Sequence, residues 1–188
     1  MRRIRTSVVA VAAGLALAGC GSSINTAANS NDDSSGNTIE QIAAADRGAA
    51  YTVSGTTLDG QALSTASWRG KVVVLNYWGS WCGPCVEETP DLKAAWAQLQ
   101  GRGVQFLGLD SQDSVATAKG FMAANGLTYP SLQWDGGKFL LPFKGLVVAA
   151  PTTVILDAQG RVAARVLAKV NTATLVGLVQ DVQAGAAG

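Results

Sequence analysis

The sequence predicts a mixed α/β domain, and three stretches carry this prediction. Residues 71–78 and 103–110 are near-continuous apolar, β-branched runs, the pattern of strands that are buried on both faces of a sheet. Residues 152–168 contain two further strand-like runs around a Gln-Gly turn, which predicts an antiparallel hairpin. Because helical stretches alternate with these strands, we expect a central mixed β-sheet flanked by helices.

Three helices are expected between and after these strands. The first, over residues 84–99, has Pro84 near its start, where a missing N–H group does no harm. Pro90 falls inside the same stretch and should kink it or break it in two. The second helix, over 114–126, has a Ser N-cap and an Asn-Gly stop, and the third closes the domain over 172–185.

Two additions to this core are expected. A β-hairpin over 51–64, turned at an Asp-Gly pair, precedes the first buried strand. Residues 127–148 are less regular and form an insertion after the second core strand, with a short strand and a turn of helix. No internal repeat is visible.

The composition excludes several classes of site. The chain has 188 residues, 48% of them hydrophobic, with three cysteines and no histidine. The absence of histidine excludes Ser-His and Cys-His nucleophilic sites and any histidine-ligated metal. Three thiols are too few for a four-ligand structural zinc site, so we expect no metal and no other cofactor. A formal charge of +1, with no basic run beyond the first five residues, leaves no electrostatic basis for nucleic-acid binding.

The N-terminus has the pattern of a lipoprotein signal peptide. Three arginines within the first five residues precede an apolar run over 8–18, which is too short to span a bilayer as a stable helix. The run ends in Leu-Ala-Gly-Cys, which resembles a bacterial lipobox. Residues 1–19 are therefore expected to be removed and Cys20 to carry lipid. The alternative is an ordinary signal peptide cut nearby, with an incidental cysteine.

This N-terminus predicts where the protein works. Lipid on Cys20 would anchor it to the cell membrane on the extracytoplasmic side, where disulfides persist. Loss of three arginines would change the formal charge from +1 to −2. Residues 20–48 are mostly small and polar without apolar periodicity, so we expect a flexible tether, with residues 39–42 as the one candidate for a short helix. The folded domain is then expected over 49–188.

Cys82 and Cys85 lie where a buried strand is followed by a helix. Unpaired N–H groups and the positive end of the helix dipole at such a position stabilise a thiolate. We expect Cys82, in the first turn, to be the solvent-accessible attacking thiol, and Cys85 to be the deeper resolving thiol. A structural staple is the other interpretation, but a disulfide across two residues closes too short a loop to stabilise the fold much. A redox-active disulfide is therefore favoured.

The block VVVLNYWGSWCGPCVEETPDL, residues 72–92, resembles the active-site block of the thioredoxin superfamily. Within that superfamily it is most similar to the extracytoplasmic TlpA/ResA-like branch, and the Trp-Cys-Gly-Pro-Cys string is its most specific feature. The resemblance covers roughly residues 50–185. It implies a thioredoxin-like fold, which fits the N-terminal hairpin and the insertion, and thiol–disulfide oxidoreductase activity.

Three residues are expected to contact substrate, and the resemblance supplies the first two. Pro151 matches the cis-proline loop that faces the cysteines in this fold, which would leave the backbone of Ala150 to pair with a substrate strand. The alternative for Pro151 is a plain strand-entry proline. Trp81 is expected to pack beside the disulfide and to shape the docking surface.

One acidic residue is also implied by the resemblance. Glu88 matches the acid that this branch places near the active site, and at three residues from Cys85 it shares a helix face with that thiol. It would therefore relay protons to Cys85; the alternative is a carboxylate that merely favours the helix dipole. Cytoplasmic thioredoxins carry a buried Asp where this sequence has Asn76, which leaves Glu88 as the main candidate for acid–base help.

The expected reaction is thiol–disulfide exchange with protein disulfides or dithiols. The Gly-Pro dipeptide and the resemblance to ResA favour a reductant of extracytoplasmic thiols, of the cytochrome c maturation type, recharged by a membrane thiol-electron carrier of the CcdA/DsbD kind. The alternative is an oxidase or isomerase of secreted proteins. Less favoured are a peroxidase, which lacks its Thr-x-x-Cys pattern here, and a non-enzymatic binding lipoprotein or metallochaperone.

Overall fold

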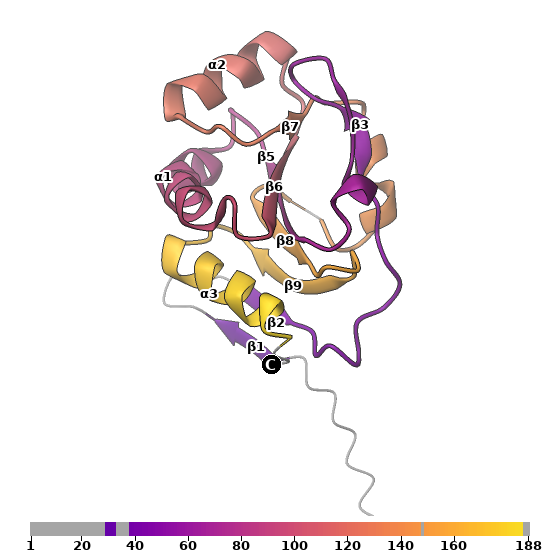
Figure 1. The fold of residues 1–188 in the computed structure, drawn as a ribbon. Helices are drawn as coiled ribbons and strands as arrows, with labels where there is room; N and C mark the ends of the chain where they lie inside the picture. The colour runs from indigo at the N-terminus through magenta and orange to yellow at the C-terminus, as the bar shows by residue number, and fades with distance from the viewer. Residues whose placement is uncertain (1–28, 33–37, 148, 186–188) are drawn as a thin grey trace, which may run out of the picture.

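The computed structural model describes residues 29–32, 38–147 and 149–185. Its main sheet has seven strands in the spatial order β1-β2-β9-β8-β5-β6-β7 (Figure 1). Their bounds are β1 Asn29–Asp32, β2 Thr38–Gln41, β5 Val72–Trp78, β6 Val104–Asp110, β7 Ser131–Leu132, β8 Thr152–Leu156 and β9 Val162–Leu167. Strand β5 is parallel to β6 and antiparallel to β8, so the predicted mixed sheet is confirmed.

Three α-helices contribute to one apolar core. Helices α1 (Gly83–Leu99), α2 (Val115–Asn125) and α3 (Thr172–Gln183) bury their apolar side chains together with one face of β5, β6, β8 and β9. Figure 1 shows α1 and α3 side by side against the sheet. Rings of Trp96, Phe106 and Tyr129 pack against one another within this core. The helix bounds agree with the sequence prediction to within two residues.

The other face of the sheet is covered by short elements. They are the hairpin of β3 (Ser54–Thr56) and β4 (Ala62–Ser64) and the 3₁₀ helices η1 (Thr65–Trp68) and η2 (Lys138–Phe143). Side chains from these segments form a second core with alternate residues of the strands, and Tyr51 stacks on Phe143 there. Both the N-terminal hairpin and the insertion after β6 are therefore confirmed.

Pro90 does not break α1 in two, because the sequence supplies a substitute hydrogen bond. The helix runs unbroken through Pro90 to Leu99. A proline at this position has no N–H group to donate to the carbonyl of Val86, one turn earlier. The hydroxyl of Thr89 donates to that carbonyl instead, at 2.9 Å.

Ordered structure precedes residue 49, where the folded domain was expected to start. Strand β2 pairs antiparallel with β9, and Ile39 is buried in the first core. Of residues 39–42, considered for a helix, residues 39–41 lie in this strand. Farther along, Arg47 forms a buried ion pair with Asp157. The strand forms because β9 offers an edge of unpaired backbone groups, which even a polar segment can satisfy through its main chain.

The predictions for residues 1–19 and for Cys20 lie outside the described residues. Within the described ranges, no helix combines the length and the hydrophobicity needed to cross a bilayer.

Candidate active site

The two cysteines form a disulfide at the junction of β5 and α1. Cys82 is the N-cap of α1, and its Sγ accepts a hydrogen bond from the backbone N–H of Cys85 at 3.3 Å. The helix N-terminus therefore directs an N–H group and its dipole at the sulfur atom that would become a thiolate. Cys85 is 2% exposed, as expected for the deeper thiol, but Cys82 is only 4% exposed, so the prediction that solvent reaches it is wrong for the oxidised form.

Glu88 lies one turn after Cys85 and is fully buried among hydrogen-bond donors. Its Oε1 accepts from Asn76 Nδ2 at 2.9 Å, and its Oε2 accepts from the backbone N–H of Val170 at 3.1 Å. Burial raises the pKa of Glu88 from 4.5 to about 7, although these two hydrogen bonds oppose the rise. A carboxyl group with such a pKa gains and loses a proton near neutrality, as a proton relay requires.

Asn76 explains how an acid can be held at this depth. It lies in β5, and its Nδ2 also donates to Thr153 Oγ1 of β8 at 3.3 Å. An amide can donate to the Glu88 carboxylate, whereas an ionised acid on the strand would repel it. The departure from the thioredoxin pattern at residue 76 and the acid at residue 88 are therefore two halves of one hydrogen-bonded pair.

The Ala150–Pro151 peptide bond is cis, as the sequence predicted. Ala150 packs against the core cluster that contains both cysteines. Pro151 directly precedes Thr152, which pairs with Tyr77 near the end of β5. The active-site loop starts from the same end of β5, so this loop and the cis-proline segment lie at one edge of the sheet.

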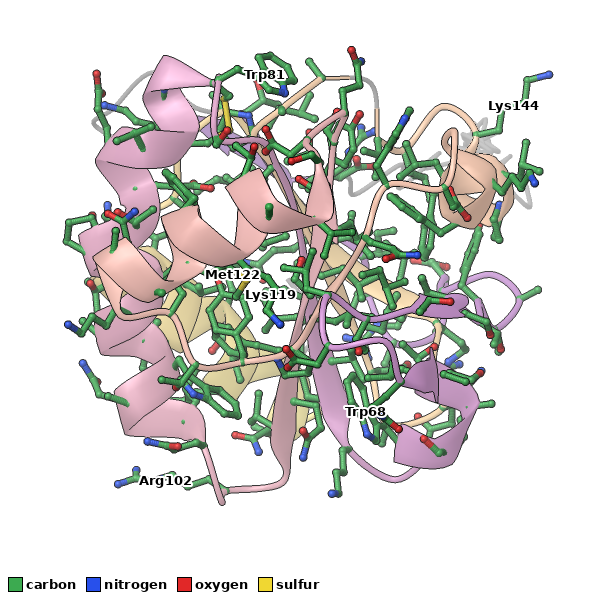
Figure 2. All side chains as sticks on the ribbon, turned by 90° about the horizontal axis from the view of Figure 1, so that it is seen from above. Trp68, Trp81, Arg102, Lys119, Met122 and Lys144 are labelled. Carbon is green, nitrogen blue, oxygen red and sulfur yellow. A yellow bond between two sulfur atoms is a disulfide. The ribbon has the colours of Figure 1, made fainter. Side chains whose placement is uncertain are left out.

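Trp81 lies beside the disulfide and reaches solvent. Figure 2 shows its ring next to the yellow disulfide bond, and the side chain is 58% exposed. The indole Nε1 donates to the carbonyl of Ser111 at 2.7 Å, which folds the ring back over Gly79. A Cβ atom at residue 79 would come within 2.5 Å of that indole nitrogen, so only glycine leaves room for it.

The segment after β6 is a part of the site that the sequence prediction missed. Asp113 accepts two hydrogen bonds from Ser80, one from its backbone N–H at 2.7 Å and one from its hydroxyl at 2.6 Å. Asp110, the last residue of β6, is buried in the same region. The signal was present, because polar residues directly after a buried strand lie at the edge of the sheet where parallel neighbours also end.

The structure thus brings the predicted site residues that it describes to one edge of the sheet. Cys82, Cys85 and Glu88 come from α1 and its cap, Trp81 from the preceding loop, and Ala150–Pro151 from the segment before β8. In the described part of the chain, no group of three or more Cys, Asp or Glu side chains is arranged to hold a metal ion.

Comparison with known proteins identifies the family. The model of the AhpC/TSA family matches residues 47–165. A thiol-disulfide oxidoreductase ResA of Bacillus thuringiensis subsp. konkukian is 30% identical over 107 residues, which is 57% of this chain and 61% of the ResA chain. The match therefore spans less than two thirds of that relative. The thiol:disulfide interchange protein HelX of Rhodobacter capsulatus is 30% identical over 118 residues, 63% of this chain and 64% of HelX.

Solved structures agree with these relatives. A DsbF homologue from Corynebacterium diphtheriae has a TM-score of 0.71 and 32% sequence identity, covering 76% of this chain and 92% of its own. A thioredoxin-family thiol:disulfide interchange protein from Chlorobium tepidum has a TM-score of 0.66 and 28% identity, covering 71% and 94%. The protein therefore belongs to the AhpC/TSA family, and its thioredoxin-like fold and Cys82–Cys85 disulfide are those expected of the thiol–disulfide oxidoreductases among its relatives.

Proposed function

We propose that the protein catalyses thiol–disulfide exchange and acts as a reductant of disulfides in extracytoplasmic proteins. The observation that carries this proposal is the combination at the start of α1. A disulfide caps the helix N-terminus, and a buried acid one turn farther on, Glu88, has a pKa of about 7. The disulfide supplies the two-electron chemistry, and the acid supplies a proton acceptor at neutral pH.

The first step is attack by Cys82. In the reduced protein, its thiolate is stabilised by the helix N-terminus and attacks one sulfur of a substrate disulfide. A mixed disulfide forms between Cys82 and that sulfur, the substrate S–S bond breaks, and the departing substrate sulfur takes up a proton.

The second step is resolution by Cys85. Its thiol gives a proton to the Glu88 carboxylate, and the resulting thiolate attacks the Cys82 sulfur of the mixed disulfide. The Cys82–Cys85 bond forms and the second substrate sulfur leaves as a thiolate, which is protonated in turn. The substrate gains two electrons and the enzyme dithiol loses them, so a dithiol donor must reduce the enzyme again.

The substrate is proposed to dock along the Ala150–Pro151 segment. Ala150 makes no hydrogen bond to another described residue, which leaves its backbone to pair with an extended substrate chain. Trp81 and Val86 are exposed apolar side chains on either side of Cys82 in the sequence and would contact the apolar part of the substrate.

The proposed cellular setting follows from the N-terminus and the relatives. Lipid on Cys20 would hold the protein at the outer side of the cell membrane, within reach of a membrane thiol-electron carrier of the CcdA/DsbD type. The ResA-like sequence supports apocytochrome c thiols as one substrate class. A second candidate is an isomerase or oxidase of secreted proteins, because a structure at 32% identity, from Corynebacterium glutamicum, is described as a secreted thiol-disulfide isomerase.

The reduction potential of the Cys82–Cys85 pair tests the direction. The chain from residue 20, carrying Cys20→Ser so that one redox pair remains, is equilibrated with dithiothreitol or glutathione buffers and its free thiols are counted. A reductant should lie near thioredoxin, about −270 mV, and an oxidase near DsbA, about −120 mV. A value near the second figure would reverse the assignment.

Two cysteine variants test the reaction itself. Cys85→Ser should stop the reaction after the first step and accumulate a mixed disulfide through Cys82 with a model disulfide substrate. Cys82→Ser is the matched control and should form far less of this adduct. Equal adduct formation by both variants, or by neither, would refute the proposed order of attack.

A further inference from the structure

A second buried acid lies beside the active-site loop without a hydrogen-bond partner. Asp110 is 0% exposed, and neither of its carboxyl oxygens has a partner among the described residues. It is the last residue of β6 and pairs in register with Trp78, the last residue of β5. The active-site loop, residues 79–81, begins directly after Trp78. Buried polar groups without partners are rare in folded proteins and require an explanation.

The segment that follows Asp110 holds the active-site loop in place. Asp113 accepts both hydrogen bonds from Ser80, and the carbonyl of Ser111 accepts the indole N–H of Trp81. Between them, Gln112 adopts a φ of 63°, a conformation that side chains rarely adopt and that turns the chain sharply. The position of Ser80 and Trp81, directly before Cys82, therefore depends on this segment.

Asp113 is the charged group that acts on Asp110. Burial is the largest cause of a rise in the pKa of Asp110 from 3.8 to about 7, and the neighbouring Asp113 carboxyl group is the next. Backbone groups of Trp134, after β7, and of Ser111 oppose this rise. From β5, the hydroxyl of Tyr77 meets the same segment by a hydrogen bond with Ser111 Oγ at 2.8 Å.

These contacts give the two acids different roles. Asp113 accepts two hydrogen bonds from Ser80 and so holds the active-site loop. Asp110 is fully buried three residues earlier in the chain, so a negative charge there would repel Asp113, and only backbone groups of Trp134 and Ser111 would oppose that repulsion. A protonated Asp110 has an O–H group that removes this repulsion and can be shared with Asp113.

We propose that Asp110 and Asp113 form a proton-sharing carboxyl pair that positions the active-site loop for exchange at Cys82. With the shared proton present, Asp113 holds Ser80 and the loop is fixed. When the proton is lost, repulsion between the carboxylates displaces residues 111–113 and loosens the contacts to Ser80 and Trp81. Both acids are positioning residues, and the inference rests on exchange chemistry at Cys82 but on neither direction of that exchange.

The test follows the backbone N–H of Ser80 and the indole N–H of Trp81 by ¹H–¹⁵N NMR from about pH 5 to about pH 9, a range that brackets the expected ionisation. The oxidised chain from residue 20 with Cys20→Ser is used. Both signals should shift with a midpoint near neutrality. Asp110→Asn, which is neutral at every pH, should lose this titration, and Asp113→Asn should lose the downfield position of the Ser80 signal.

Two control variants separate this pair from other acids. Glu88→Gln removes the other buried acid that titrates near neutrality and should leave the Ser80 titration in place. Asp181→Asn removes an exposed charge near the end of α3, at the opposite end of the sheet, and should change nothing. A titration that persists in Asp110→Asn, disappears in Glu88→Gln or is absent from the parent chain would overturn the proposal.

Two further measurements complete the test. The first works even if a variant fails to fold, and the second distinguishes a positioning role of Asp110 from a merely structural one. The ¹³C shift of the Asp110 carboxyl group in the parent chain needs no substitution, and a midpoint near an ordinary aspartate pKa of about 3.9 would overturn the proposal. In the reduced protein, the ratio of alkylation rates at Cys82 between Asp110→Asn and the parent should change from about pH 6 to about pH 8. A constant ratio would overturn the positioning role. Because neither measurement needs turnover, an inactive protein would contradict the proposed function and leave this inference standing.

Discussion

A buried aspartate lies at each end of the central sheet, and the pKa values of the two are shifted in opposite directions. Asp157 follows β8 at the end far from the disulfide and shares its carboxylate with Arg47 and Arg161, at 3.3 and 2.8 Å. Burial alone would raise the pKa of Asp157, but hydrogen bonds from Arg161 and Arg47 outweigh it and hold the pKa below its ordinary value. At the active-site end, Asp110 is equally buried, has no such partner, and its pKa is raised to about 7.

This difference separates an acid that holds the fold together from acids that lie beside the site. The far end joins the N-terminal segment, through Arg47, to the turn between β8 and β9. At the active-site end, Asp110 and Glu88 both favour the protonated form and so oppose folding once the pH rises through their pKa. Groups poised in this way destabilise a fold and are concentrated where proton transfer or positioning is needed.

The largest expected effect is on the far end. Asp157→Asn removes the buried carboxylate that Arg47 and Arg161 share. We expect a loss of about 3 kcal/mol in the free energy of unfolding at neutral pH. Urea unfolding, monitored by circular dichroism, measures this loss.

The matched control makes the same change of charge, from Asp to Asn, in an ion pair that is exposed and not buried. Asp59→Asn breaks the exposed ion pair between Asp59 and Lys119, at 2.8 Å, and should change the free energy of unfolding by less than about 1 kcal/mol. Equal effects of the two substitutions would show that burial of Asp157 does not decide its contribution.

Glu88→Gln should stabilise the protein at alkaline pH, whereas Asp157→Asn should destabilise it. A raised pKa means that the contribution of Glu88 to stability is fully present below its unfolded value of 4.5 and is lost as the pH rises through about 7. The neutral variant escapes this loss, so near pH 8 it should be more stable than the parent by up to about 3 kcal/mol, with little difference near pH 4. Urea midpoints at the two pH values measure the change.

The same variant should be slower as an enzyme. Without a proton acceptor at residue 88, resolution of the mixed disulfide should slow by about 100-fold at neutral pH, the lower end of what a positioned acid or base contributes. Rapid-quench trapping of the mixed disulfide would show it accumulating. A variant that is destabilised by the same amount at both pH values, or that resolves at the parent rate, would contradict the relay assigned to Glu88.

The sequence predicted those features whose signals are local. The strand-to-helix junction was enough to identify Cys82 and Cys85 as a pair, and family resemblance added Glu88, which lies within seven residues of Cys82. The buried strands β5 and β6 carry continuous apolar runs, and the cis bond at Pro151 came from family resemblance. The helix bounds followed from caps such as Ser114, whose side chain accepts from the N–H of Thr117.

The features that were missed depend on contacts between distant segments. The pairing of residues 38–41 with β9 joins a polar stretch to a strand more than 120 residues later, and no apolar alternation marks it. Asp113 and Ser80 are 33 residues apart, and neither has a pattern that distinguishes it from an ordinary loop residue. The burial of Cys82 likewise depends on segments packed around the helix N-terminus. Local periodicity carries no information about such contacts.

The smallest expected change tests whether the amide at residue 76 is what allows Glu88 to be charged. Asn76→Asp replaces the donor that lies 2.9 Å from Glu88 Oε1 with a second acid, as in cytoplasmic thioredoxins. Two carboxyl groups at this distance cannot both ionise readily, so the pKa of Glu88 should rise further and the pair should retain one proton above neutrality. Near pH 8 the variant should lose about 1–2 kcal/mol relative to the parent, and less near pH 4, where both acids are protonated in the folded state. Urea midpoints and the ¹³C carboxyl shift of Glu88 measure the two effects. An unchanged Glu88 titration would mean that burial alone sets its pKa. The acids at the two ends of the sheet would then differ in their solvation and not in their hydrogen-bond partners.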